Sequence, residues 1–407
     1  MGMKCRTLFL LAAAALLLSG GAMAQPKEVK IGLIAPLSGP WARQGELMKK
    51  GAELAVDDIN GAGGIQALGG AKIRLIVGDA GENAEKAKNA AQRLLSEHSD
   101  LSAGTGAWLS SFTLAVTEVT ERAKLPWLTL SYSEQITARG FKYVFQTSAT
   151  AAAQAQMTLP IVIKAALAAG AAKPKTMGVI SDNTASPVNF MKYMREKGLQ
   201  ENGIELVVDE VFTPPLADAT PPVQKVRQRR PDMMLVYPTN TGDVKLVLEK
   251  FKEFNLDKGR LPMFGNGAQF GTPEILNAVG KDLLEGFIFS LANWPTKPTE
   301  AMAKRFMIRF NEPFIGQDPV STYGDIQLLK TVIERVKSAD AEKVAEGLRT
   351  IDLKDGAASF YPGGRVKFEE NGRRIDAGIY LVQWQNGVPV TVYPPESAQA
   401  PIIWPKK

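Results

Sequence analysis

Residues 29–40 read Val-Lys-Ile-Gly-Leu-Ile-Ala-Pro-Leu-Ser-Gly-Pro, and this stretch decides the fold class. Its apolar run ends at Pro36 and is followed by turn-forming residues, which predicts a strand that leads into a loop. The apolar and small residues of 46–60 then recur with helical spacing, and the glycine-rich segment 61–64 ends that helix. A strand, a loop and a helix in this order are typical of an α/β fold.

The same alternation continues along the chain. Residues 73–77 alternate as a strand does, residues 84–95 have helical spacing, and residues 125–130 read as another strand. Strands that alternate with helices predict a parallel sheet covered on both faces. From about residue 142 the pattern restarts and predicts a second α/β unit, with strands at 143–145, 177–180, 205–212, 233–237, 263–264 and 286–289, a Pro-rich connection at 214–222, and later helices at 300–311, 323–337 and 339–348.

The length of 407 residues exceeds what one hydrophobic core usually supports, so two domains are expected. Residues 1–24 have the layout of a secretory signal peptide, because a positive region precedes an apolar run at 8–18 and small residues at 22–24. That run is too short to span a bilayer. We therefore expect an exported chain that begins at Gln25.

Several kinds of chemistry are disfavoured by the composition. Cys5 is the only cysteine and His98 the only histidine, and Cys5 would leave with the signal peptide. A Ser/His/Asp triad, a thiolate nucleophile and a zinc site therefore lack their residues. The net charge of +6 falls to +4 (6 − 2) without Lys4 and Arg6, which is too mild to indicate a nucleic-acid partner. We expect no enzyme, no metal and no cofactor.

The candidate ligand site is the stretch from Gly104 to Val116, which reads Gly-Thr-Gly-Ala-Trp-Leu-Ser-Ser-Phe-Thr-Leu-Ala-Val. Small residues, then Ser110 and Ser111, precede an apolar run with helical spacing. The unpaired N–H groups of a helix N-terminus, with nearby hydroxyls, can hold a small anion such as a carboxylate. The alternative is that one serine only caps the helix.

Three hydroxyl residues follow predicted strands, namely Ser38, Ser110 and Ser131. In parallel sheets ligands bind beyond the carboxyl ends of the strands. These loops are therefore expected at one edge of one sheet.

The chain resembles the periplasmic solute-binding proteins of branched-chain amino acid ABC transporters, which have the type I periplasmic binding protein fold. The resemblance is carried by residues 29–40, 51–65, 137–145, 380–384 and 392–394. It implies an α/β fold of two doubly wound parallel-sheet lobes, joined by three crossover strands, that close on a ligand like a hinge. The crossings would lie near Gln146, Ala292 and Asp355, which gives lobes of 25–146 plus 293–354 and of 147–292 plus 355–407.

The resemblance also implies the site. In that family a serine loop and the hydroxyl loop after the next strand hold the carboxylate of the ligand. An ungapped match leaves Ser110 and Ser111 as alternatives for the first loop. The residues at the matching positions are Trp41, Gln44, Trp108, Ser110, Ser111, Ser131, Tyr132 and Ser133 in the first lobe and Asn183, Ser186, Asn240, Thr241 and Asn266 in the second.

Asn266 and Gly267 stand where amino-acid binders of this kind often carry an acidic residue for the ammonium of the ligand. A buried ammonium without a carboxylate partner is poorly compensated. The solute is therefore expected to be an amino acid or a related acid or amide, and this loop favours another small carboxylate, an aromatic acid or an amide over leucine or valine.

The function that the resemblance implies is capture of a small solute in the periplasm by a monomeric protein and its delivery to an inner-membrane ABC permease, without a nucleic-acid partner. A ligand-sensing protein of the same fold is the alternative.

Overall fold

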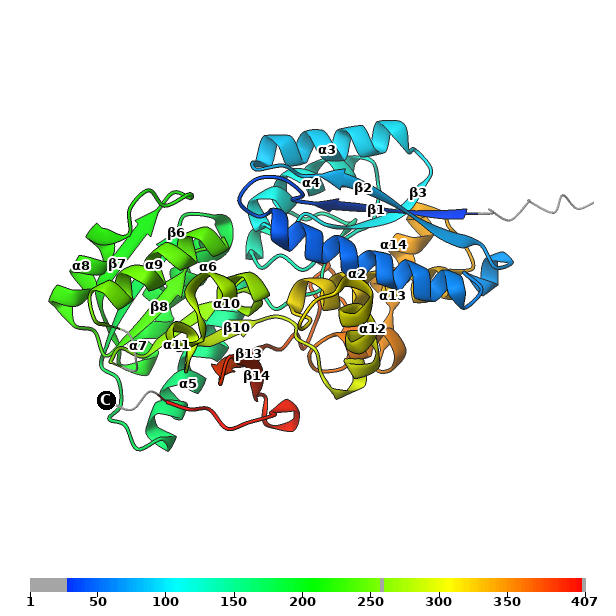
Figure 1. Cartoon of the computed structure of the whole chain (residues 1–407). Helices are drawn as coiled ribbons and strands as arrows, with labels where there is room; N and C mark the ends of the chain where they lie inside the picture. Colours follow the sequence, from blue (N-terminus) through cyan, green and yellow to red (C-terminus); the bar gives the residue numbers. More distant parts are fainter. Residues whose placement is uncertain (1–27, 257–259, 405–407) are drawn as a thin grey trace, which may run out of the picture.

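A computed structural model describes residues 28–256 and 260–404 of the chain. The predicted signal peptide lies outside the described residues. Figure 1 shows two α/β lobes that lie side by side, with the chain passing between them.

The first lobe is built on a five-stranded parallel sheet with the order β2-β1-β3-β4-β5. Helices cover both faces: α3 and α4 lie above the strands in Figure 1, and α2 and α13 lie below them. This is the arrangement that the alternation of strands and helices predicts. The elements are β1 (Glu28–Ala35), α2 (Ala42–Gly61), β2 (Lys72–Asp79), α3 (Ala84–Glu97), β3 (Leu101–Gly106), α4 (Ser110–Arg122), β4 (Trp127–Thr129), β5 (Val144–Gln146), α12 (Glu300–Phe310), α13 (Gln317–Val336) and α14 (Ala341–Thr350).

The second lobe is built on a seven-stranded sheet with the order β14-β13-β10-β9-β8-β6-β7. Its last two strands run antiparallel and form a hairpin at one edge. Separate hydrophobic cores fill the two faces of this sheet. The elements are α5 (Ala151–Ala168), β6 (Thr176–Asp182), α6 (Ala185–Tyr193), β7 (Glu205–Phe212), α8 (Thr220–Arg229), β8 (Met233–Tyr237), α9 (Thr241–Glu253), β9 (Met263–Asn266), α10 (Pro273–Val279), α11 (Lys281–Leu284), β10 (Ile288–Leu291), β13 (Tyr380–Gln385) and β14 (Val388–Tyr393).

The elements expected from the sequence do not include α8, which begins inside the expected Pro-rich connection at 214–222 and runs on to Arg229. Pro221 and Pro222 occupy the first turn of this helix. Proline is tolerated there because the first-turn N–H groups have no intrahelical acceptor. The two prolines therefore start a helix instead of preventing one.

Helix α5 is long and apolar enough to cross a bilayer by length and composition alone. Half of it is buried inside the protein, and Ala155, Leu159 and Val162 belong to a second-lobe core. The apolar residues of this helix therefore pack inside the second lobe.

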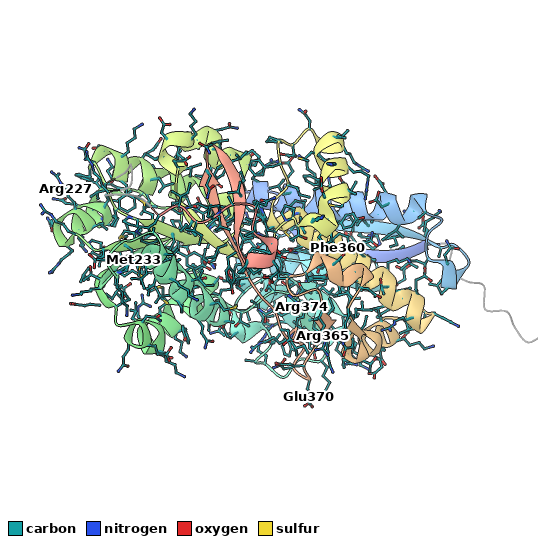
Figure 2. The ribbon with its side chains drawn as sticks, turned by 90° about the horizontal axis from the view of Figure 1, so that it is seen from below. Arg227, Met233, Phe360, Arg365, Glu370 and Arg374 are labelled. Atoms are coloured by element: carbon teal, nitrogen blue, oxygen red, sulfur yellow. The ribbon has the colours of Figure 1, made fainter. Side chains whose placement is uncertain are left out.

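The third passage between the lobes differs from the expectation of a return near Asp355. Tyr361 and Phe368 still pack in the core of the first lobe, whereas Ile379 belongs to a second-lobe core. Between them Arg374 is buried and donates hydrogen bonds to the carbonyls of Thr147, Pro362 and Arg365. Figure 2 shows Arg374 near the middle of the molecule. The chain changes lobe after Arg374, because the apolar residues of 357–368 complete the first core.

Candidate functional site

A cavity of about 30 Å³ lies between the two lobes, beyond the carboxyl ends of β3 and β4 in the first lobe and of β8 and β9 in the second. This volume has room for little more than a water molecule. No charged side chain is found among the described residues that line it. They are Trp108, Leu109, Ser110, Leu130, Ser131, Tyr132, Ser186, Tyr237, Thr239, Asn266, Gly267, Ala268, Gln269 and Gln317.

Ser110 is the first residue of α4, and its hydroxyl lies at the first-lobe side of the cavity. Its Oγ accepts hydrogen bonds from the backbone N–H groups of Tyr132 and Ser133, each at 3.1 Å. Leu109 is the N-cap residue, and no side chain caps this helix. The capping alternative is therefore wrong. Ser111 is half-buried and does not line the cavity.

The loop of residues 131–133 is held rigidly beside Ser110. Ser131 Oγ donates to the carbonyl oxygen of Trp108 at 2.7 Å. The hydroxyl of Tyr132 donates to Gln317 Oε1 at 2.6 Å. Ser133 Oγ lies 3.1 Å from Asn189 Nδ2 of the second lobe, which donates to it. These contacts fix the two N–H groups that point at Ser110.

Trp108 forms one wall of the cavity and has a left-handed backbone, with φ of 50°. Its indole Nε1 donates to Asp318 Oδ1 at 2.9 Å. Asp318 is fully buried, and burial raises the pKa of its carboxyl to about 7, although the hydrogen bond from Trp108 opposes the rise. Trp108 is thus held in place by a carboxyl group that lies behind the cavity wall.

Trp41 does not line the cavity, but it bridges the lobes beside it. Its Nε1 donates to Thr239 Oγ1 at 3.3 Å, and Thr239 in turn donates to the buried Asp182 through its hydroxyl and its backbone N–H. Burial raises the pKa of Asp182. Gln44, one turn further along α2, is buried but does not line the cavity, and its Nε2 has no partner among the described residues.

In the second lobe, Asn266 and Ser186 line the cavity as the resemblance implies. Ser186 Oγ lies 3.1 Å from the hydroxyl of Tyr237. Asn266 ends β9, and its Nδ2 donates to Gln154 Oε1 at 2.7 Å and to Ser290 Oγ at 2.9 Å.

Three predicted second-lobe residues do not reach the cavity. Asn183 is exposed and bonds Thr213. Asn240 is the N-cap of α9, where its Oδ1 accepts from the backbone N–H of Asp243. Thr241 follows it in the first turn. Their side chains shape the loop and the helix start, so the position of a loop in the fold does not decide which of its side chains faces the site.

The sequence prediction missed several lining residues, and those that carry a polar group are Tyr237, Thr239, Gln269 and Gln317. Thr239 and Gln269 lie within three residues of Asn240 and Asn266. The loops were therefore identified, but Asn240 was selected in place of Thr239, and Gln269 was overlooked beside Asn266. Gln317 begins α13, far along the chain. Only the return of the chain to the first lobe brings it to the cavity.

Across residues 28–256 and 260–404, no three or more histidine, cysteine, aspartate or glutamate side chains are grouped so that they could hold a metal ion. Two α/β lobes with a cavity between them, lined by neutral polar and apolar side chains, define a class of protein that captures a small molecule between its lobes.

The chain belongs to the family described as "Periplasmic binding protein", whose model matches residues 28–388. It is 28% identical to Leu/Ile/Val-binding protein homolog 8 of Brucella melitensis over 391 residues, which covers 93% of this chain and 94% of that relative. The proteins of this family are binding proteins of the periplasm, and capture of a solute is their function.

Two solved structures show the same fold. The substrate-binding protein LivJ of Streptococcus pneumoniae, in complex with isoleucine, aligns with a TM-score of 0.75 at 20% identity and covers 89% of this chain and 99% of its own. A solute-binding protein of Rhodopseudomonas palustris, in complex with 3,4-dihydroxybenzoic acid, aligns with a TM-score of 0.75 at 21% identity and covers 92% of this chain and 99% of its own. The expected type I periplasmic binding protein fold is confirmed.

Proposed function

We propose that this protein captures a small carboxylate-bearing solute between its lobes and delivers it to an inner-membrane ABC permease. The observation that carries the proposal is the pair of backbone N–H groups, of Tyr132 and Ser133, that converge on Ser110 Oγ. Two fixed N–H donors beside a hydroxyl at a helix N-terminus match the two oxygens of a carboxylate.

The hydroxyl of Ser110 is itself a free donor. Its oxygen accepts from two N–H groups, and it donates no hydrogen bond to any part of the chain that the structure describes. When a carboxylate takes over the two N–H groups, the hydroxyl can turn and donate to it as well. The site then supplies three donors to one anion without any cationic side chain.

Binding requires the lobes to separate, because residues of both lobes line the cavity and the space between them holds little more than water. Hydrogen bonds such as those of Trp41 with Thr239 and of Asn189 with Ser133 cross between the lobes, and they can break when the lobes open about a hinge. A ligand that contacts both lobes favours the closed state, since only a difference in affinity for the two states can shift their populations.

The relatives support a carboxylate ligand. Isoleucine and 3,4-dihydroxybenzoic acid, the ligands of the two solved structures, share only a carboxyl group. Residues 1–24 would direct export as a cleaved signal peptide, and we propose a monomer whose partner is the permease rather than a nucleic acid. Nothing in the site favours a sensor over a transport protein.

The test uses two adjacent serines. Ser110→Ala removes the hydroxyl at the cavity, and Ser111→Ala removes its neighbour on the same helix outside the cavity. The mature protein is screened by thermal shift against amino acids, aromatic acids, dicarboxylates and amides, and the best ligand is measured by calorimetry. We expect Ser110→Ala to weaken binding by more than about tenfold, because it removes a donor to a charged group, and Ser111→Ala to leave it unchanged. Equal effects of the two variants, or a best ligand without a carboxylate, would overturn the proposal.

A further inference from the structure

The two ends of the cavity differ in their hydrogen-bonding chemistry. The first lobe offers donors, as described for Ser110. In the second lobe, Asn266 is completely buried, and its Oδ1 has no hydrogen-bond partner in the described part of the chain. A buried polar atom without a partner is rare in a folded protein and asks for an explanation.

The orientation of the Asn266 amide is fixed by a chain of contacts. Gln154 Nε2 donates to the carbonyl oxygen of Ala149 at 2.9 Å, so Gln154 turns its Oε1 toward Asn266. Both Gln154 Oε1 and Ser290 Oγ accept a hydrogen bond from Asn266 Nδ2. The amide nitrogen is therefore committed to the protein, and Oδ1 is the polar atom of this cavity-lining side chain that has no partner in the described part of the chain.

Gln269 presents a second acceptor in the same way. Its Nε2 donates to the carbonyl oxygens of Pro238, at 2.6 Å, and Asn266, at 3.0 Å. Its Oε1 accepts no hydrogen bond in the described structure, and Gln269 also lines the cavity. The second lobe thus offers two amide oxygens whose orientation is set by their own nitrogen atoms.

The electrostatic setting disfavours a cation at these acceptors. Three helices begin at the cavity: Ser110 and Gln317 are the first residues of α4 and α13, and Ser186 is the second residue of α6. The N-terminus of a helix carries a partial positive charge, which favours an anion and opposes an ammonium. The lining also holds no carboxylate that could pair with an ammonium.

We infer that the solute is a small carboxylic acid that carries an uncharged hydrogen-bond donor, a hydroxyl or a primary amide, at the end bound by the second lobe, where Asn266 accepts it. This inference rests on the proposed function and adds to it the specificity-determining group. Asn266 selects the donor, and the absence of a charged partner rejects an ammonium.

The test compares ligands that differ in one group. One series is benzoate, para-hydroxybenzoate and para-(aminomethyl)benzoate, and the other is leucine, its α-hydroxy analogue and the parent acid without either group. Affinities are measured by calorimetry on the mature protein. In at least one series we expect the hydroxy acid to bind at least about fivefold more tightly than its parent, because the parent leaves the acceptor unpaired. The ammonium member should bind most weakly of its series.

Asn266→Ala removes the acceptor, and the hydroxy acid should then lose its advantage over the parent acid. Gln383→Leu is the matched control, since Gln383 is a buried amide of the same sheet whose nitrogen and oxygen all have partners away from the cavity. It should lower the melting temperature and keep the preference. If Asn266→Ala does not fold, Asn266→Ser takes its place, because serine keeps a small polar side chain that is too short to hold the acceptor in position.

The outcomes separate the two proposals. If carboxylic acids bind but the hydroxy and parent acids bind equally, or the ammonium member binds best, this inference is wrong and the carboxylate proposal stands. If none of the carboxylic acids binds, both are wrong. An unchanged preference in the Asn266 variant would remove that residue as the selecting group.

Discussion

The guanidinium of Arg43, on α2 of the first lobe, forms an ion pair with Glu274, on α10 of the second lobe, with Nε and Oε1 2.8 Å apart. Arg43 is also paired with Glu312 of its own lobe at 2.7 Å. Of these two pairs only the one with Glu274 depends on the lobes being closed. Opening of the lobes would therefore break the Arg43–Glu274 ion pair, and this pair stabilises the closed state.

Glu274→Gln should shift the population toward the open state. The side chain of Glu274 is 39% exposed, so the pair is worth no more than about 1 kcal/mol. Ligand affinity should fall by about fivefold or less, and its dependence on salt should weaken. Small-angle scattering should give a larger radius of gyration without ligand. Glu249→Gln, which removes an ion pair with Lys245 inside α9, is the control; an equal loss of affinity there would contradict the role of Glu274.

Gly267→Ala should damage the site more than the fold. Gly267 has φ of 115°, and a Cβ atom there would lie 2.4 Å from Gln269 Oε1, one of the two acceptors. Gly280 has φ of 79° and open space around a Cβ atom. Both substitutions should cost about 1–3 kcal/mol of stability, because both glycines combine a positive φ with a ψ near 160°, a backbone conformation that is open essentially to glycine alone. Only Gly267→Ala should also weaken ligand binding, as measured by calorimetry; intact affinity would show that Gln269 does not contact the ligand.

Asp318 should make the protein less stable as the pH rises. Its pKa is raised from 3.8 to about 7 by burial, so between these values the folded state keeps a proton that the unfolded state has released. The free energy of unfolding then falls with rising pH, by up to about 1.4 kcal/mol per pH unit, and this contribution is constant above the folded pKa.

Asp318→Asn should remove that slope, because the amide oxygen can still accept from Trp108 and carries no charge. Urea unfolding at about pH 5 and pH 8 measures it. Asp325, whose pKa burial raises to about 6, should leave a smaller slope of the same sign below that pH. Parallel pH profiles of the wild type and Asp318→Asn would refute the prediction.

Arg374→Met should destabilise the protein by about 3 kcal/mol or more, because three buried carbonyl oxygens lose their donor. Arg365→Met is the comparison. Arg365 pairs with Asp352 at 2.8 Å, but this pair lies at the surface, so the loss of Arg365 should cost much less stability than the loss of Arg374. Urea unfolding curves measure the stability of both variants. Similar losses of stability would contradict the prediction that the Arg374 hydrogen bonds stabilise the fold more than the surface ion pair does.

The sequence predicts much of this fold because periodicity is a local property. Residues 84–95 have helical spacing, and α3 runs from Ala84 to Glu97. Residues 205–212 were expected as a strand and form β7 over the same range. The prediction failed at α8, where a Pro-rich connection was expected although the prolines stand in the first turn of a helix. It also failed at residues 357–368, because contacts with distant residues decide to which lobe they belong.

The sequence by itself determined the two α/β units, the loops at the carboxyl ends of the strands, and the near absence of histidine and cysteine chemistry. These follow from residue spacing and residue type, which are fixed along the chain. Only the tertiary structure decided that Ser110 rather than Ser111 faces the cavity, that Asn266 rather than Asn240 lines it, and that Gln317 joins them. Each of these depends on the direction of one side chain and on helices that return from far along the chain. A local sequence pattern encodes neither the direction of a single side chain nor the return of a distant helix.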